Sequence, residues 1–388
     1  MESDKNLCVG ITAIDSVSAL GTGDTCWESF RNKSHLLHRT RRSGKTIWSG
    51  NIPEQLSDEI LQLHAENPNY IKLDKSVLQA IWICRRLVDA AGWQAEDGFG
   101  INIGSSRGAT TLFEKYHKEF LDNSRASSLA SPTTTLGNIA SWVAHDLGSA
   151  GPELSHSITC STSLHALLNG VAWLEAGLSS KFLVGGSESP LTPFTIAQMQ
   201  ALKIYSRYEE PFPCKALDLN KLNNSMVLGE GAAMACLEKG NKEKALALVT
   251  GIGYATEKLE HPASFSADGE CIQKSMAMAC KGIDLEEVDI VVMHAPGTKK
   301  GDQSEYRAIA KLFGSRIPAL TTNKWKIGHT LGSSGMINIQ MAVLMLQHQE
   351  FIGVPYLVKS EAPGKIENIL VNAVGFGGNA VSVLLKNN

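Results

Sequence analysis

The chain has 388 residues, of which 43% are hydrophobic and 19% are charged, with a formal net charge of −3. Its length predicts about two or three domains of ordinary size, and its charge gives no overall reason to expect nucleic-acid binding. The first residues lack the pattern of a signal peptide, and no apolar run approaches the roughly 18 residues of a membrane span. The eight cysteines form no C-x-x-C pair, which disfavours zinc and redox motifs and favours free thiols in a reducing cytoplasm.

Strands alternate with helices along the predicted chain. The stretch 31–45 is basic and is expected to form an exposed loop. A helix is expected over 74–91, where apolar residues recur at helical spacing, and buried strands are expected at 100–104, 181–186 and 289–294. This alternation indicates an α/β fold in which helices cover sheets.

The two halves of the chain resemble each other weakly. Each begins with a strand-like apolar run, continues through a small-residue elbow into a long apolar helix, and nears its end at a strand followed by paired glycines. A polar stretch at 238–244 separates them, so we expect one domain over 1–240 and a second over 241–388. The pattern favours a duplicated α/β unit, and the alternative is chance similarity between two α/β halves.

Cys160 is the cysteine with the most distinctive surroundings. It follows a strand-like run at 153–159 and precedes an apolar helix, and the small residues 161–163 leave room for a bulky adduct. At a helix N-terminus the positive end of the dipole favours a thiolate, so Cys160 is a candidate nucleophile. The alternative is an inert buried cysteine, which is the usual role of this residue type.

Two histidines have glycine-rich surroundings. His294 ends a predicted strand and enters a turn, and His329 lies between Gly328 and Gly332. Each could be a purely structural histidine. Together with Cys160, however, two imidazoles without metal-like spacing suggest acyl transfer through a thioester.

Five motifs then carry a resemblance over essentially the whole length. The chain is similar to the β-ketoacyl synthases of the thiolase superfamily, of the elongating, decarboxylating type with a Cys-His-His site. The motifs are the nucleophile region at 136–167, V-L-G-E-G-A-A-M-A-C-L-E at 227–238, H-x-x-G-T-x-x-G-D-x-x-E at 294–305, K-x-x-x-x-H at 324–329 and G-F-G-G-N-A at 375–380.

The resemblance implies a five-layer αβαβα fold made of two similar halves, and usually a dimer. It implies a 3-oxoacyl-[acyl-carrier-protein] synthase, which condenses an acyl thioester with malonyl-ACP in fatty-acid, polyene or polyketide elongation, without a metal or organic cofactor. One alternative is a partner subunit that sets chain length in a heterodimer, although such partners usually lose the nucleophile. A thiolase is less favoured, because no second cysteine follows Cys280 near the last glycine motif.

Five catalytic roles follow from the resemblance, residue by residue. Cys160 matches the nucleophile that takes the acyl chain. His294 and His329 match the pair that promotes malonyl decarboxylation and stabilises the enolate. Lys324 matches a lysine that supports this site electrostatically, and Glu305 matches an acid that positions that lysine.

Further matches concern substrate binding. Phe376 matches a gating aromatic residue whose backbone N–H joins that of Cys160 in the oxyanion hole. Thr298 matches a threonine that touches the pantetheine arm, whereas His-Ala295-Pro296 replaces the usual His-Gly-Thr and removes one such contact.

Two other departures point to a specialised pathway. Arg107 falls where elongating enzymes place an apolar residue that lines the acyl tunnel, and Ser163 replaces a usual glycine. Because ACP is acidic, exposed cations should guide it to the tunnel mouth; the candidates are Lys72, Arg125, Lys203 and Arg207.

Overall fold

The computed structural model describes residues 7–42, 45–136, 138–240, 242–258, 266–357 and 362–388. The strands are β1 (Val9–Ser18), β2 (His38–Arg42), β3 (Lys45–Gly50), β4 (Gly100–Gly104), β5 (Glu153–Leu154), β6 (Lys181–Glu188), β7 (Leu228–Gly229), β8 (Gly231–Lys239), β9 (Ala247–Thr256), β10 (Ile290–Val292), β11 (Ala319–Thr321), β12 (Asn368–Gly375) and β13 (Asn379–Lys386).

The α-helices alternate with these strands. They are α1 (Thr25–Arg31), α2 (Glu54–Leu61), α3 (Leu63–Glu66), α4 (Lys75–Ala91), α5 (Thr110–Asn123), α6 (Ala130–Thr134), α7 (Asn138–Leu147), α8 (Thr162–Glu175), α9 (Pro193–Ala201), α10 (Glu270–Ala279), α11 (Lys299–Phe313), α12 (Lys324–Ile327) and α13 (Ser334–His348). The short 3₁₀ helices are η1 (Tyr70–Lys72), η2 (Ala95–Asp97), η3 (Thr159–Ser161), η4 (Leu285–Glu287) and η5 (Leu331–Ser333).

The two halves share one sheet topology. Outward from the centre, the first half runs β1-β8-β6-β4-β5 and the second half runs β9-β13-β12-β10-β11. In both, the first two pairings are antiparallel and the last two are parallel. The half-sheets join where β1 pairs antiparallel with β9. The duplicated α/β unit expected from the sequence is therefore present in the strand order.

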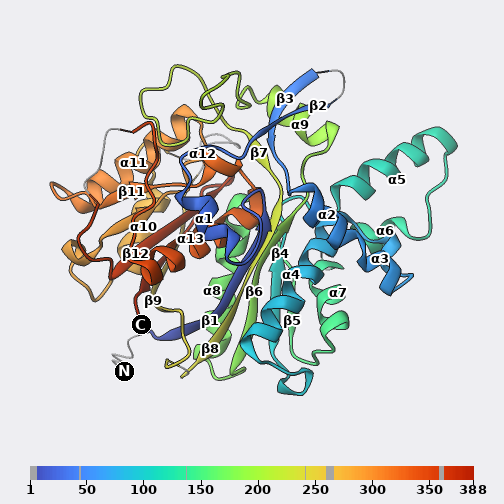
Figure 1. The fold of residues 1–388 in the computed structure, drawn as a ribbon, viewed down its shortest axis with the longest axis horizontal. Helices are drawn as coiled ribbons and strands as arrows, with labels where there is room; N and C mark the ends of the chain where they lie inside the picture. Colours follow the sequence, from blue (N-terminus) through green and yellow to red (C-terminus); the bar gives the residue numbers. More distant parts are fainter. Residues whose placement is uncertain (1–6, 43–44, 137, 241, 259–265, 358–361) are drawn as a thin grey trace.

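Helices lie on both faces of each half-sheet, with α8 and α13 between the two halves (Figure 1). Side chains of β8 show how the layers are built, because alternate residues of a strand point to opposite faces. Ala233, Ala235 and Leu237 join the central core around α8 and α13. Met234 and Cys236 join the outer core against α4 and α7.

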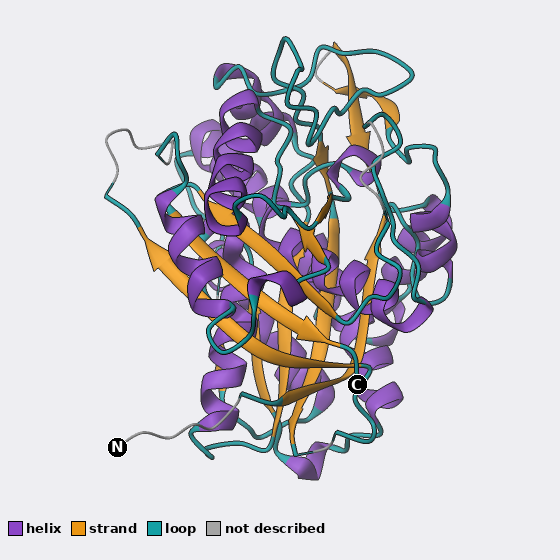
Figure 2. Ribbon diagram, turned by 90° about the vertical axis from the view of Figure 1, so that its left-hand side faces the viewer, coloured by secondary structure: helices purple, strands orange, loops and turns teal. Residues whose placement is uncertain are grey.

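The second half repeats this arrangement, since β12 and β13 pack on one side against the central core and on the other against α10 and α11. Figure 2 shows the strands passing through the middle of the molecule with helices on both sides. The αβαβα layering expected from the sequence is confirmed.

Most of the predicted elements are confirmed close to their predicted bounds. The helix predicted over 74–91 is α4, and its start is capped by Asp74, whose carboxylate accepts a 2.9 Å hydrogen bond from the N–H of Ser76. Gly92 ends α4 at a φ of 67°, which glycine adopts without strain. The predicted strands correspond to β4, β6 and β10.

Two local predictions are wrong. The basic stretch 31–45 contributes β2 and the start of β3, which pair as an antiparallel hairpin, apart from residues 43–44, which lie outside the described residues. The predicted strand at 153–159 is reduced to β5, because Thr162 Oγ1 accepts a 2.9 Å hydrogen bond from the N–H of Ile158 and turns the backbone toward α8. In the described ranges, no helix is long and apolar enough to cross a membrane.

Candidate active site

Cys160 lies in η3, which leads directly into α8, and its side chain is buried. The hydroxyl of Thr162 donates a 2.6 Å hydrogen bond to the carbonyl of Thr159 and so ties η3 to the first turn of α8. The end of β12 passes close by: a Cβ added at Gly375 would lie 2.0 Å from Thr159 Oγ1. Only a glycine allows this approach, which places the segment of Phe376 beside the nucleophile.

The two histidines are held by backbone contacts from other segments. His294 follows β10, and its N–H donates a 2.8 Å hydrogen bond to the Glu305 carboxylate. His329 follows α12; its N–H donates to the carbonyl of Val227 at 2.7 Å, and its carbonyl accepts from the N–H of Gly229 at 3.0 Å. These hydrogen bonds fix the backbone of both histidines, His294 just after β10 and His329 alongside β7.

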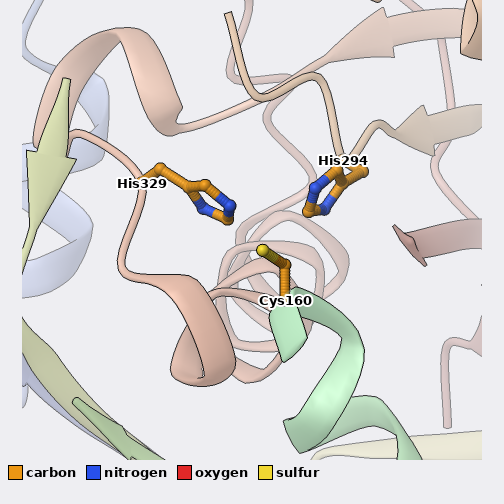
Figure 3. Close-up of side chains that lie close together, drawn as sticks. All are labelled: Cys160, His294 and His329. Carbon is orange, nitrogen blue, oxygen red and sulfur yellow. The ribbon is translucent and has the colours of Figure 1, made fainter. Parts of the chain in front are cut away.

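These elements bring the three side chains together. The Cys160 sulfur and one ring nitrogen of each histidine lie within 4.8 Å of one another. The two imidazoles meet edge to face, with ring centroids 5.2 Å apart and an interplanar angle of 83°. Figure 3 shows both rings pointing toward the Cys160 sulfur.

Both imidazoles are neutral at ordinary pH. Burial lowers the pKa of His294 and of His329 well below the usual value, and the nearby Lys324 ammonium lowers both further. A neutral imidazole carries one N–H, so each ring can donate one hydrogen bond without bringing a positive charge of its own. The positive charge of the site belongs to Lys324.

Lys324 is fully buried in α12, and its ammonium has no hydrogen-bond partner among the described residues. Burial lowers its pKa to about 8, against the opposing effect of the Glu305 carboxylate. The side chain is therefore charged below pH 8, where its field acts on Cys160 and both histidines.

The Cys160 thiol does not have the lowered pKa that its helix terminus led us to expect. Burial raises its pKa to about 12, the Glu188 carboxylate adds to this rise, and Lys324 opposes it. Desolvation of the thiolate therefore outweighs the favourable charges around it.

Glu305 contacts the histidine backbone rather than the lysine that the resemblance pairs with it. Its two carboxylate oxygens accept 2.8 Å hydrogen bonds from the N–H groups of His294 and Ala295, and one also accepts from the Asn372 amide at 3.3 Å. Within the described ranges, no lysine or arginine nitrogen forms an ion pair with it inside 4.0 Å. Glu305 thus acts on Lys324 through its charge.

A cavity of about 640 Å³ opens over the three residues, and Arg107, Thr298 and Phe376 also line it. Phe376 is 40% exposed, and its carbonyl accepts a 3.3 Å hydrogen bond from the Thr159 hydroxyl. Thr298 caps α11 by accepting from the N–H of Gly301. The side chains named from the sequence for acyl and pantetheine contacts therefore share one cavity.

Arg107 is half-buried at the wall of this cavity. Its guanidinium donates to the side-chain oxygen of Gln198 and, at 3.4 Å, to the hydroxyl of Thr195, both on α9. A buried guanidinium needs such partners, because an unpaired one is costly to remove from water. The apolar side chains of Met199, also from α9, and of Leu202, which follows this helix, line the same cavity.

The four cations proposed for carrier docking, Lys72, Arg125, Lys203 and Arg207, are all exposed. Lys203 lies between Leu202 and Ile204, which line the cavity. Sequence reasoning missed two further exposed cations at the cavity, Lys300 and Arg307. The Lys-Lys doublet in the turn after His294 was the available signal for the first of them.

Sequence reasoning also missed a buried ion pair behind His294. The Lys221 ammonium lies 2.6 Å from an Asp302 carboxylate oxygen, and both side chains are almost fully buried. Asp302 also accepts a 3.0 Å hydrogen bond from the N–H of Gly297, so the pair fixes the loop that follows His294. No local signal could reveal it, since the partners are 81 positions apart.

Comparisons with known proteins identify the family and the fold. The family model described as the N-terminal domain of β-ketoacyl synthase matches residues 12–243, and the model of the C-terminal domain matches residues 246–355. A curated relative, the 3-oxoacyl-[acyl-carrier-protein] synthase 2 of Staphylococcus aureus strain MRSA252, is 25% identical over 98% of this chain and 99% of its own.

Two solved structures share the fold. One is a ketosynthase in complex with its type II polyketide synthase acyl-carrier protein and bound to a hexaketide, with a TM-score of 0.85 and 19% identity over 99% of this chain and 100% of that one. The other is the ketosynthase of Xenorhabdus doucetiae in complex with its chain length factor, with a TM-score of 0.79 and 20% identity over the whole of both chains. The two family models together span most of the sequence, and the chain belongs to the β-ketoacyl synthase family.

Proposed function

We propose that this β-ketoacyl synthase condenses an acyl group, held as a thioester on Cys160, with malonyl-ACP, and releases carbon dioxide and β-ketoacyl-ACP. The observation that carries the proposal is the convergence of the Cys160 sulfur and the two imidazoles within 4.8 Å, beside the buried Lys324. A chain-length subunit without catalysis would not require these groups together. Retention of all of them favours an active synthase.

Acyl transfer is the first step. The Cys160 sulfur attacks the carbonyl carbon of acyl-ACP, the bond from that carbon to the carrier sulfur breaks, and the thiol proton ends on the released carrier thiol. The backbone N–H groups of Cys160 and Phe376 stabilise the oxyanion, and removal of one such donor from an enzyme typically costs about 3–4 kcal/mol. Because burial opposes the Cys160 thiolate, the Lys324 charge assists the attack.

Condensation is the second step. The bond between the malonyl carboxylate and its α-carbon breaks, carbon dioxide leaves, and the electron pair forms an enolate on the remaining thioester. The neutral imidazoles of His294 and His329 donate hydrogen bonds to the enolate oxygen, and the buried site makes them stronger than they would be in water. The α-carbon then attacks acyl-Cys160, which frees the cysteine and leaves the product on the carrier.

The cavity and the relatives support a proposal for the partners and the pathway. The carrier docks at the exposed cations around the cavity mouth, and Thr298 contacts the pantetheine arm. The chain acts as a dimer, either with itself or with a ketosynthase-like subunit such as the chain length factor seen with the Xenorhabdus enzyme. Arg107 in the cavity wall favours specialised polyene or polyketide elongation over bulk fatty-acid synthesis.

Mass spectrometry tests the first step directly. The purified protein is incubated with a panel of acyl-ACPs, and the adduct is mapped by peptide mass analysis. We expect one acylated residue, Cys160, and no adduct in the Cys160→Ala variant. Acylation that persists in this variant would reject the assignment.

A further inference from the structure

Glu188 is a buried acid that the proposed mechanism does not use. It is the last residue of β6, and its side chain is fully buried. No lysine or arginine nitrogen of the described chain lies within ion-pair distance of it, and one carboxylate oxygen, Oε2, has no hydrogen-bond partner there. An unpaired carboxylate is costly to bury, so Glu188 is a candidate for a role beyond packing.

The other carboxylate oxygen joins two separate segments of the cavity. Glu188 Oε1 accepts hydrogen bonds from the backbone N–H of Ser106 and, at 3.1 Å, from that of Gly332. Ser106 precedes Arg107 in the cavity wall, and Gly332 lies three residues after His329. A single oxygen atom thus connects the acyl side of the cavity to the segment that carries one catalytic imidazole.

The three segments pack so closely that Gly332 and Gly186 have no room for a side chain. A Cβ added at Gly332 would lie 2.6 Å from Glu188 Oε1 and 2.7 Å from the Ser106 nitrogen. A Cβ added at Gly186, two residues before Glu188, would lie 2.9 Å from the carbonyl oxygen of Gly332. Glycine is required at both places, and the packing leaves the carboxylate as the acceptor for both N–H groups.

The charge of Glu188 does not help the nucleophile. It raises the pKa of Cys160, together with burial and against Lys324. Burial raises the pKa of Glu188 itself to about 8, while the N–H groups of Ser106 and Gly332, the Ser105 hydroxyl and the Arg107 charge lower it. We therefore expect the position of the Glu188 acceptor oxygen, rather than the negative charge of the side chain, to matter for the site.

We propose that Glu188 is a positioning residue, which holds the Ser106–Arg107 wall against the turn after His329 and so keeps His329 and the acyl pocket in register around Cys160. The inference deepens the proposed function, on which it rests. A neutral glutamine keeps a carbonyl acceptor of the same shape, whereas alanine removes it.

Hydrogen exchange on the intact protein tests the positioning without any substrate. In Glu188→Ala, peptides covering 105–108 and 331–335 should exchange faster than in the parent, because both N–H groups lose their acceptor. Glu188→Gln should exchange like the parent. Equal protection in the alanine variant, or equal loss in both variants, would overturn the proposal.

Thiol alkylation tests the effect of the Glu188 charge, since Glu188 and Lys324 are the charged groups that act on Cys160, beside the neutral imidazoles of His294 and His329. Above pH 8, where Glu188 is ionised, Glu188→Gln should raise the iodoacetamide alkylation rate of Cys160 by roughly three- to tenfold. Below about pH 7 the two rates should converge, because the parent carboxyl is then protonated. Parent-like rates above pH 8 would overturn this account, and the readout still serves if Glu188→Ala fails to fold.

Turnover completes the test. Condensation by Glu188→Ala should fall by roughly ten- to a hundredfold in kcat, as expected for a misplaced catalytic group, while Glu188→Gln should retain most of the parent kcat. Asp146→Asn is the matched control, because Asp146 is a buried carboxylate bound to Arg85 and Tyr70, away from the cavity.

A Glu188→Gln variant as inactive as Glu188→Ala would assign Glu188 a charge-dependent role instead. If the parent itself fails to acylate Cys160, the proposed function fails, and the exchange and alkylation results still decide the role of Glu188.

Discussion

Ser163 on α8 accepts a 3.0 Å hydrogen bond from the backbone N–H of Met336 on α13. The first N–H groups of a helix have no acceptor within that helix, so the hydroxyl of one half of the molecule caps the helix of the other. Gly335 allows the contact, since a Cβ there would lie 3.0 Å from Ser163 Oγ. The serine that replaces a usual glycine after the nucleophile therefore ties α8, which follows Cys160, to α13, which follows His329.

Ser163→Ala should lower the free energy of unfolding by about 1–3 kcal/mol, because a buried N–H loses its partner. Ser334→Ala is the matched control: its hydroxyl is also buried in α13 but has no partner in the described part of the chain, so its loss should cost less. Urea denaturation of the three proteins measures the difference. Equal costs for both variants would contradict the capping role.

Lys324 should set an alkaline limit to decarboxylation. Its pKa is lowered to about 8, so its positive charge is present below that pH and is lost above it. In a Cys160→Ala background, which removes the thiol, release of carbon dioxide from malonyl-ACP should decline as pH rises through about 8. Replacement of Lys324 by Met should lower the rate of carbon dioxide release and remove this decline, the alkaline limb of the pH profile.

Lys326→Met is the control for that experiment. The pKa of Lys326 is also lowered to about 8 by burial, but its ammonium donates to the backbone carbonyls of Asn32 and Ser34, away from the catalytic groups. This variant should keep the alkaline limb of the parent. An unchanged pH profile in Lys324→Met would show that another group causes the limb.

Arg107 should restrict the acyl group that Cys160 accepts. Its guanidinium, held by Gln198 and Thr195, places charge in the wall of an otherwise mainly apolar cavity. Arg107→Ile should therefore extend acceptance toward longer saturated chains, as measured by acylation rates with a series of acyl-ACPs. Arg307→Ile removes a different cavity-lining cation and should leave the chain-length profile unchanged; a parent-like profile in both variants would place Arg107 outside the acyl path.

Carrier binding should depend on the exposed cations proposed for docking. Reversal of Lys72, Arg125, Lys203 and Arg207 to Glu should raise KM for ACP substrates by roughly two- to tenfold at low salt, because rim charges steer association. The effect should shrink at high salt, where exposed charges are screened. Kinetics that stay unchanged at every salt concentration would reject this docking surface.

Local motifs in the sequence predicted the candidate catalytic residues. Interactions between residues that are distant in the sequence were missed. Cys160, His294 and His329 could each be chosen from its own glycine- or serine-rich segment. The pKa of Cys160 could not, because it depends on burial among residues that are distant in the sequence, such as Ile47, Met199 and Leu331. The Gln198 partner of Arg107 was equally invisible, since 91 positions separate them.

In the fold, too, local elements were predicted from the sequence and long-range pairings were not. The α4 helix and the β4 strand follow from local periodicity and capping, whereas the hairpin of β2 and β3 forms in a stretch whose charges suggested a loop. The order β1-β8-β6-β4-β5 and its repeat in the second half depend on pairings between distant residues. The weak echo between the halves predicted the repeat but none of its pairings.

The central claim is that Cys160 takes the acyl group whereas His294 and His329 act in the decarboxylation of the malonyl group. Separate measurement of these two steps in His294→Ala and His329→Ala tests it most directly. Both variants are given acyl-ACP and then malonyl-ACP, and Cys160 acylation and carbon dioxide release are measured in the same reactions. We predict near-parent acylation and a loss of carbon dioxide release of the order of a hundredfold or more, because the donors act on the enolate. Release of carbon dioxide at the parent rate by either variant would contradict the account.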